Sequence, residues 1–211
     1  MRLTKEFVGA FLAVIAATLA FGIVYPLAVT GISQVVFPNK ADGSKVTVNG
    51  KVVGSKLLGR EWVLDTGKKD SDGNPITKPD PKYFQPRPSA TGYSATATFF
   101  ANRGPNSASA VFFYRDGLAA YLALEGPYDQ GLTKAQVPPD AVETSASGVD
   151  PHISPANAEI QAHRIAAVRN LSLDRVNQLI DDNTDGRFLG LYGDPGVNVL
   201  KLNLALDQEA A

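Results

Sequence analysis

The chain has 211 residues, of which 44% are hydrophobic and 19% are charged, so it is long enough for one globular domain with a substantial core. Its 20 Lys and Arg residues nearly balance its 21 Asp and Glu residues, and the formal net charge of -1 excludes the basic surface that nucleic-acid binding requires. Because the chain contains no cysteine, disulfides, thiolate metal sites and thiol nucleophiles are excluded as well.

The N-terminal part has no charged residue between Glu6 and Lys40, and residues 7–29 are almost entirely apolar. This run predicts a transmembrane helix, because about 35 Å of helix is enough to cross a hydrocarbon core of about 30 Å. Pro26 is expected to kink or end the helix near the membrane interface. A cleaved signal peptide is the alternative, but the apolar core of such peptides is usually only about 7–15 residues long.

The charges beside the helix do not fix its orientation by count alone. A short basic tail that carries Arg2 and Lys5 usually stays in the cytoplasm, and a long domain after the helix translocates largely regardless of its charge. We therefore expect a single-pass protein of the inner (plasma) membrane with a cytoplasmic tail at residues 1–6. A linker at 30–45 and a soluble extracytoplasmic domain at 46–207 would follow.

The first elements expected after the helix are strands. Short alternating runs flank Asn49-Gly50 and predict a β-hairpin over residues 45–53, since both turn residues tolerate positive φ. Residues 62–64 extend the strand pattern. The stretch 65–82 is rich in Lys, Asp, Gly and Pro, and this composition predicts a surface loop.

Helices are predicted in the middle of the chain. Apolar residues recur at helical spacing over 108–124, although Asp116-Gly117 leaves a hairpin there as an alternative. Ser154-Pro155 combines an N-cap with proline at the first helical position and predicts a helix that ends near Arg169. Ser172 is expected to cap the next helix.

Two strands are predicted near the C-terminus, over residues 188–192 and 197–206. The second prediction depends on the alternation of leucines at 200, 202, 204 and 206, and the segment 193–196 would supply the turn between the strands. The expected fold class is therefore α+β, with a single N-terminal transmembrane helix followed by one mixed α/β soluble domain.

Candidate catalytic and metal sites are few. Residues 181–186 match the start of a calcium loop, but Tyr192 stands where the loop requires a bidentate Glu, so no metal site is predicted. Ser147, Asp150 and His152 suggest a membrane-tethered hydrolase. However, residues so close in sequence do not normally converge as a triad, and the nucleophile-elbow pattern is missing.

Three segments together resemble a known family. The first is Tyr-Phe-Gln-Pro-Arg-Pro-Ser-Ala at 83–90, and the second runs from Val-Pro-Pro-Asp at 137–140 to Ser-Ala-Ser-Gly-Val-Asp-Pro-His-Ile-Ser at 145–154. The third is Leu-Gly-Leu-Tyr-Gly-Asp-Pro-Gly-Val-Asn-Val-Leu at 189–200, followed by Leu-Asn at 202–203. In their order and in chain length they are similar to the C subunit of the Kdp potassium-transporting P-type ATPase. Residues 94–109 lack the glycine-rich run of that family.

The resemblance implies a non-catalytic accessory subunit of an ATP-driven, high-affinity potassium uptake complex. Its implied partners are a channel-like potassium-translocating subunit and the P-type ATPase subunit, together with membrane lipid. The resemblance also implies a catalytic chaperone that raises the ATP affinity of the ATPase subunit, with ATP contacted directly or affected only indirectly.

The residues singled out belong to the family motifs. Arg87 is a candidate for a carboxylate pair or a partner contact, and Asp150 is expected to bond backbone N–H groups before the capped helix. The full set of candidate partner-interaction or motif residues is Tyr83, Phe84, Gln85, Arg87, Ser147, Gly148, Asp150, His152 and Asn198.

Overall fold

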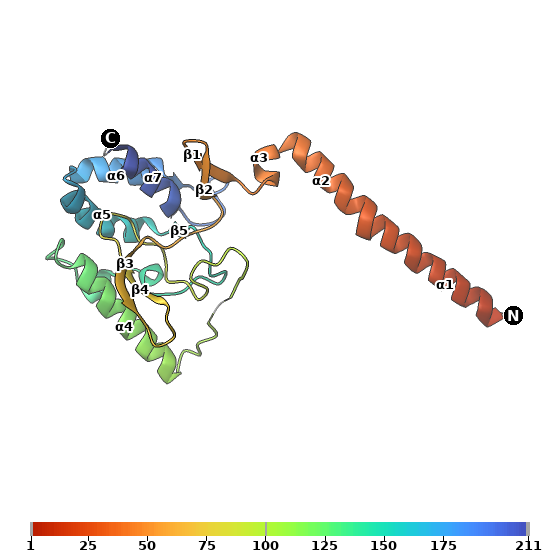
Figure 1. The fold of residues 1–211 in the computed structure, drawn as a ribbon, viewed down its shortest axis with the longest axis horizontal. Coiled ribbons are helices and arrows are strands. Elements are labelled where there is room, and N and C mark those ends of the chain that lie inside the picture. The colour runs from red at the N-terminus through yellow and green to blue at the C-terminus, as the bar shows by residue number, and fades with distance from the viewer. Residues whose placement is uncertain (1, 100, 210–211) are drawn as a thin grey trace. The chain divides into compact units, whose positions relative to one another are not determined.

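The computed structural model describes residues 2–99 and 101–209. The chain forms two compact units, Met1–Ser55 and Lys56–Ala211. An N-terminal apolar helix precedes a domain of mixed helix and sheet, as the fold class predicted from the sequence requires (Figure 1).

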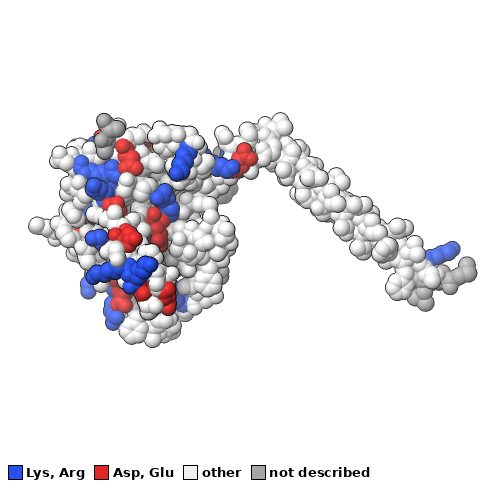
Figure 2. Space-filling model, in the orientation of Figure 1, with Lys and Arg blue, Asp and Glu red and all other residues white. Residues whose placement is uncertain are grey.

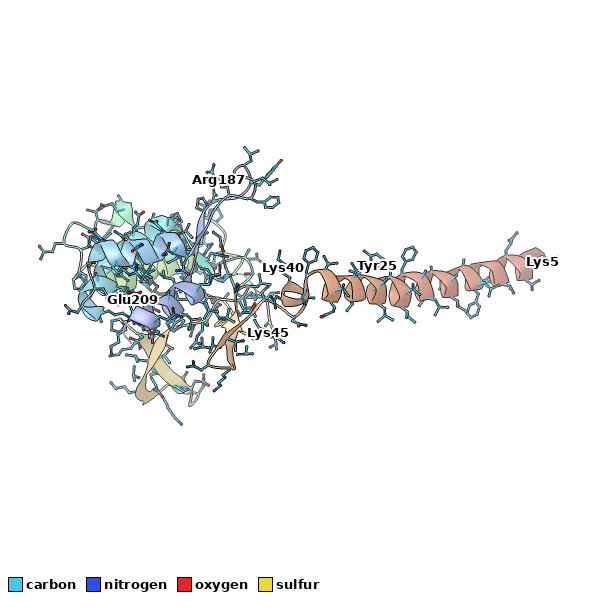
Figure 3. The ribbon with its side chains drawn as sticks, turned by 90° about the horizontal axis from the view of Figure 1, so that it is seen from above. Lys5, Tyr25, Lys40, Lys45, Arg187 and Glu209 are labelled. Atoms are coloured by element: carbon cyan, nitrogen blue, oxygen red, sulfur yellow. The ribbon has the colours of Figure 1, made fainter. Side chains whose placement is uncertain are left out.

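The first unit is dominated by one long helix, made of α1 (Arg2–Leu19), a π-helical turn (Ala20–Val24) and α2 (Tyr25–Val36). Its segment Thr4–Val36 has a mean hydropathy of 2.5, and none of it is buried by the rest of the chain. It is therefore long and apolar enough to cross a membrane once. It carries no charged residue between Glu6 and Lys40, and Lys5 and Lys40 mark the ends of this apolar stretch (Figures 2 and 3).

The helix continues beyond the range predicted for it. The structure shows helix through Val36, so residues 30–36 of the expected linker are helical. Pro26 does not end the helix but lies in the first turn of α2, directly after the π-helical turn. The wider turn lets the Tyr25 N–H bond the carbonyl of Ala20, and this gives the chain room for a proline that has no N–H to donate.

The rest of the first unit is a short helix α3 (Pro38–Ala41) and the hairpin β1 (Lys45–Val48) with β2 (Lys51–Ser55). The hairpin confirms the prediction from Asn49-Gly50, since φ is 51° at Asn49 and 77° at Gly50.

The second unit begins with an element that the sequence did not predict. β3 (Val63–Lys69) and β4 (Pro75–Pro79) form an antiparallel hairpin, so the prediction of a surface loop over residues 65–82 was wrong. The Asp70 carboxylate organises the turn by accepting hydrogen bonds from the N–H groups of Asp72 and Asn74. Both strands are largely solvent-exposed, so they lack the apolar alternation that identifies a strand in sequence.

The three central helices confirm the predictions. They are α4 (Ala108–Glu125), α5 (Pro155–Arg169) and α6 (Leu173–Asp182). Each has a serine N-cap, at Ser107, Ser154 and Ser172 respectively, whose hydroxyl accepts a hydrogen bond from the N–H three residues on. α4 continues through Asp116-Gly117, so the alternative hairpin there is wrong.

The C-terminal strand predictions were wrong. Residues 188 and 192 form only an isolated bridge, and the longer segment splits into β7 (Gly196–Asn198) and the helix α7 (Val199–Glu209). α7 buries a face at helical spacing, formed by Val199, Leu200, Leu202, Asn203 and Leu206. The alternate leucines fit a strand equally well, and residue 203, which breaks that pattern, is a buried asparagine.

A small sheet links distant parts of the second unit. β7 is its central strand and pairs antiparallel with β5 (His152–Ile153) on one side and β6 (Thr184–Asp185) on the other. The hydrophobic core lies between this sheet and the helices α5, α6 and α7. Its largest fully buried apolar side chains are Phe84, Ile153, Ile165, Leu200, Leu202 and Leu206.

Candidate functional site

Two side-chain amides hold the extended segment around Phe84. Each hydrogen-bonds both the N–H and the carbonyl of one backbone residue, as a neighbouring β-strand would. The Asn203 amide accepts a hydrogen bond from the Phe84 N–H at 2.9 Å and donates one to its carbonyl at 3.0 Å. Gln161 on α5 does the same for Gln85, accepting at 2.7 Å and donating at 3.1 Å. Both amides are buried, so the backbone of the segment is fixed at two consecutive residues.

A buried ion pair supports the same segment. The Arg164 Nε lies 3.0 Å from each carboxylate oxygen of Glu125, and both side chains are inaccessible to solvent. The Arg164 guanidinium also donates to the carbonyls of Pro81, at 2.6 Å, and Tyr83, at 3.0 Å. Burial raises the pKa of Glu125, and the positive charge of Arg164 opposes that shift. The pair therefore links α4 to α5 and fixes the chain that leads to Phe84.

Arg87 lies where this segment meets a polar groove. Its Nη1 lies 3.4 Å from Oδ2 of Asp150, and both side chains are partly exposed. The pair confirms the carboxylate alternative that was left open for Arg87. Asp150 also accepts a hydrogen bond from the His152 N–H at 3.0 Å, as its expected role before α5 requires.

His152 lies between two carboxylates in this groove. Its Nδ1 is 3.6 Å from Asp150 Oδ1, and its Nε2 is 3.2 Å from Asp185 Oδ2. Lys201 on α7 approaches the other oxygen of Asp185 at 3.3 Å. The groove has a volume of about 410 Å³ and is also lined by Asp140, Ser154, Gly186 and residues 194–196.

These contacts shift the ionisation of the three groups. The hydrogen bond to Asp150 raises the pKa of His152; partial burial opposes this shift, and Asp185 adds to it. Burial acts to raise the pKa of Asp150, but the bonds from His152 and the charge of Arg87 outweigh it, so the net pKa is lowered. For Asp185, burial again acts to raise the pKa, but the hydrogen bond with His152 and the charge of Lys201 outweigh it, so the net pKa is lowered.

The Ser145–Gly148 turn is packed against the first motif. Gly148 has a φ of 73°, and its carbonyl accepts hydrogen bonds from the hydroxyls of Ser89, at 2.6 Å, and Thr91, at 3.0 Å. A Cβ at this position would lie 2.9 Å from the Thr91 Oγ1, so the close approach requires glycine.

The Ser147 hydroxyl is not arranged for hydrolysis. It accepts the Val149 N–H at 3.2 Å, while the His152 ring is engaged by Asp150 and Asp185. A nucleophilic serine requires a hydrogen bond to its base, and this geometry gives no support to the hydrolase alternative.

Asn198 joins the groove to the start of the second unit. Its amide donates to the carbonyl of Lys56 at 2.9 Å, and its oxygen accepts the Lys201 N–H at 3.1 Å at the start of α7. In β7 it pairs with His152.

Arg87 also lines a second, more apolar cleft. It has a volume of about 280 Å³ and is lined by the Pro86–Ser89 stretch, Tyr93, the β3–β4 hairpin and the α4 residues Gly117, Ala120, Tyr121 and Leu124. Within residues 2–99 and 101–209, no group of three or more His, Asp or Glu side chains is placed to hold a metal ion.

The fold brings all the motif residues into the second unit, but in different environments. Phe84 is fully buried, and Gln85 and Tyr83 lie partly buried beside it. Arg87, Asp150 and His152 meet in the groove, whereas Ser147 and Gly148 lie in the turn beside Ser89.

Sequence reasoning gave no supporting role to six polar residues that hold these motifs in place. Glu125, Gln161 and Arg164 lie outside every motif that was noted. Asp140 and Asn203 belong to the family segments and Asp185 to the calcium-loop pattern, but their contacts were not predicted.

One signal was available, because Gln161 and Arg164 stand at helical spacing beside Ala158, Ala162 and Ile165 in α5 and so share their apolar face. A charged residue on such a face indicates a buried partner elsewhere in the fold.

Comparisons with known proteins match one family along nearly the whole chain. Residues 7–208 match the model of a family described as KdpC: K+-transporting ATPase, c chain. A potassium-transporting ATPase KdpC subunit from Streptomyces avermitilis is 41% identical, over 92% of this chain and 89% of that protein. KdpC subunits from Cereibacter sphaeroides and Methylococcus capsulatus are each 42% identical over 96% of this chain, and over 96% and 97% of their own lengths.

Proposed function

The chain belongs to the KdpC family of K+-transporting ATPase c chains, and from this membership we propose that it acts as a non-catalytic accessory subunit that stabilises an ATP-driven potassium uptake complex. The partners in this proposal are a P-type ATPase subunit and a channel-like, potassium-translocating subunit. The first would hydrolyse ATP and the second would conduct the transported ion, so this chain needs no reaction centre of its own.

The observation that carries the proposal is the uncovered helix. No residue of Thr4–Val36 is buried by its own chain, so we expect lipid and partner helices to cover its apolar surface. Small residues cluster on it and allow close helix packing. They are Ala10, Ala13, Ala16, Ala17 and Ala20.

The polar groups of the second unit support an accessory role in a different way. Arg87, Asp150 and His152 bond mainly to one another and to neighbouring strands. The buried amides and the Glu125–Arg164 pair are used to fix the chain's own backbone. A unit built in this way can serve as a rigid body that holds one arrangement of its partners.

A rise in ATP affinity follows from such a rigid body without direct ATP contact. If the subunit binds the ATP-competent conformation of the ATPase more tightly than the other conformations, the population shifts and the apparent affinity for ATP increases. Reciprocally, ATP should tighten the association of this chain with the complex.

The orientation in this proposal is N-in and C-out, which follows from the short basic tail. The soluble unit would then lie across the bilayer from cytoplasmic ATP, and the helix would transmit the coupling. Protease added to intact spheroplasts should digest the soluble unit, whereas protection there would reverse the orientation.

The proposed function is tested by co-purification and kinetics in mild detergent. The tagged wild-type chain should retain a P-type ATPase and a channel-like protein, and complexes without the chain should need more ATP to reach half-maximal turnover. Ala13→Phe with Ala17→Phe should reduce co-purification, because the bulk separates packed helices.

Ile15→Phe is the matched control, since it adds an aromatic ring on the opposite side of the same helix. Recovery of the wild-type chain alone from its native host would overturn the proposal. Equal losses in both variants would mean that the small-residue face is not the packing surface.

A further inference from the structure

The connection between β6 and β7 carries an uncovered apolar tip. All residues from 185 to 195 are exposed, so this segment adds nothing to the core of its own unit. Four large apolar side chains lie within five residues, and their exposed fractions are 70% for Phe188, 75% for Leu189, 78% for Leu191 and 66% for Tyr192. Single exposed apolar residues are ordinary, but a cluster of this kind indicates an external surface that it contacts.

The tip has a defined conformation without packing against the core. The Phe188 N–H donates to the Tyr192 carbonyl at 2.8 Å, and the Tyr192 N–H donates back at 3.0 Å. Leu189 has a φ of 54° and is followed by Gly190 at 74°, so a bulky residue occupies a conformation that leucine rarely adopts. The turn therefore presents its side chains outward in a conformation that exists before anything binds.

Charged groups are confined to the base of the tip. No charged residue lies between Phe188 and Gly193, while Arg187 lies 3.5 Å from Asp194 where the segment leaves the body of the unit. Figure 3 shows Arg187 on this projecting segment. The tip carries uncharged aromatic and leucine side chains, and its base is charged. This arrangement matches the increase in polarity from the acyl boundary to the lipid headgroups.

We propose that the Phe188–Tyr192 tip inserts into the lipid interface of the same membrane that holds the N-terminal helix. This inference rests on the anchoring proposed above but not on the identity of the pump partners. Residues 37–55, which include α3 and the β1–β2 hairpin, connect the helix to the second unit; even fully extended they would reach at most about 65 Å, and the folded elements shorten this reach.

The anchor makes lipid the occupant that the observations favour. A tether of that length keeps the second unit at a high effective concentration beside the bilayer, so even weak insertion of four side chains is populated. Tyr192 suits the interface because its ring combines an apolar body with a hydroxyl that can face the polar boundary, and Phe188 adds apolar surface beside it. Insertion would hold the second unit at a fixed height and limit its rotation about the tether.

The absence of cysteine from the sequence allows a direct test. Leu191→Cys in the full chain would carry a nitroxide label, and the protein would be reconstituted into vesicles of phosphatidylcholine and phosphatidylglycerol. Membrane-dissolved oxygen should collide with this label far more often than a water-soluble nickel chelate does. Ser71→Cys, in the exposed turn between β3 and β4, is the control and should favour the nickel chelate.

Each outcome decides the proposal. An oxygen-to-nickel collision ratio at residue 191 several-fold above the Ser71 value supports insertion. Equal ratios at both positions would show an aqueous tip and overturn it. A label that is aqueous in vesicles but shielded from both reagents in the assembled complex would also overturn it, since the tip would then contact a protein partner. Because the vesicle measurement uses this chain alone, its failure is distinguishable from failure of the proposed pump function.

Discussion

The two units of the chain distribute their polarity in opposite ways. In the first unit, the helix exposes its apolar side chains on every side, and no residue of Thr4–Val36 is buried. In the second unit, both members of an ion pair are buried in the interior: Arg164 is 0% exposed and Glu125 is 1% exposed. The helix has an apolar surface for an environment outside the chain, whereas the second unit buries charge that only its own fold can compensate.

This difference separates two sources of stability. The helix needs surroundings that match its surface, because its exposed side chains gain nothing from the rest of the chain. The second unit depends on exact internal pairing, because an unpaired buried charge costs far more than an exposed one. Substitutions should therefore harm the two units for opposite reasons. Added charge should weaken membrane insertion of the first unit, and removal of a buried charge should lower the folding stability of the second.

The largest expected effect comes from breaking the buried pair. Arg164→Ala leaves the Glu125 carboxylate buried without its partner, so we expect the second unit to lose about 3–5 kcal/mol of stability. The measurement is denaturant unfolding of the full chain in detergent, followed by the near-ultraviolet signal of the second unit.

The matched control for this change is Arg175→Ala. Arg175 pairs with Glu209 at 2.7 Å, but both side chains are partly exposed and the pair is screened by water, so the expected loss is much smaller than for Arg164→Ala. Similar losses for both variants would show that burial does not distinguish the two pairs.

The second prediction adds charge to the first unit. Leu19→Arg places a cation at the end of α1, near the middle of the apolar segment, and should cost about 2.5–3.5 kcal/mol of membrane insertion. Alkaline extraction of membranes should release the variant, while the wild type stays with the lipid pellet.

Ile76→Arg is the control, since Ile76 is exposed on β4 of the second unit. It should leave extraction unchanged. Full retention of Leu19→Arg in the pellet would mean that partner helices or water shield the new charge.

The smallest effect is expected from pH, at the groove of the second unit. The raised pKa of His152 contributes stability below its unfolded value of 6.5, and this contribution disappears as pH rises through the folded pKa. The lowered pKa values of Asp150 and Asp185 contribute above 3.8 and disappear as pH falls through their folded values.

The charged forms of Asp150, His152 and Asp185 should therefore stabilise the second unit most between about pH 4 and 6.5. His152→Gln should reduce stability in that window by less than about 1 kcal/mol, because the groups are partly exposed. Denaturation curves at a series of pH values test this prediction. A deficit that is constant from pH 4 to 9 would show that the imidazole acts through packing rather than through charge.

Local signals in the sequence predicted the elements that depend on local physics. An unbroken apolar run identified the helix, Asn49-Gly50 identified the first hairpin, and the serines at 154 and 172 identified two helix starts. The end of the long helix was missed because Thr30, Gly31, Ser33 and Gln34 dilute the apolar character of its last turns.

The remaining errors have a non-local cause. The strand predicted over 197–206 is mostly α7, because Asn203 is buried against Phe84, and that contact is invisible to periodicity. The family motifs contain Arg87, Asp150 and His152, and the structure brings these three side chains together in the groove. Asp185 and Lys201 complete the site from other elements: Asp185 carried only the signal of an incomplete calcium loop, and Lys201 carried no motif signal.

The pairing of Asn203 with Phe84 also has a consequence for how the protein is made. The two residues are 119 positions apart in the sequence. During synthesis the Phe84 backbone cannot obtain this partner until α7 has left the ribosome. The second unit therefore stays incomplete until α7 has been made, and a nascent chain that stops short of α7 remains open to proteases that remove incomplete products.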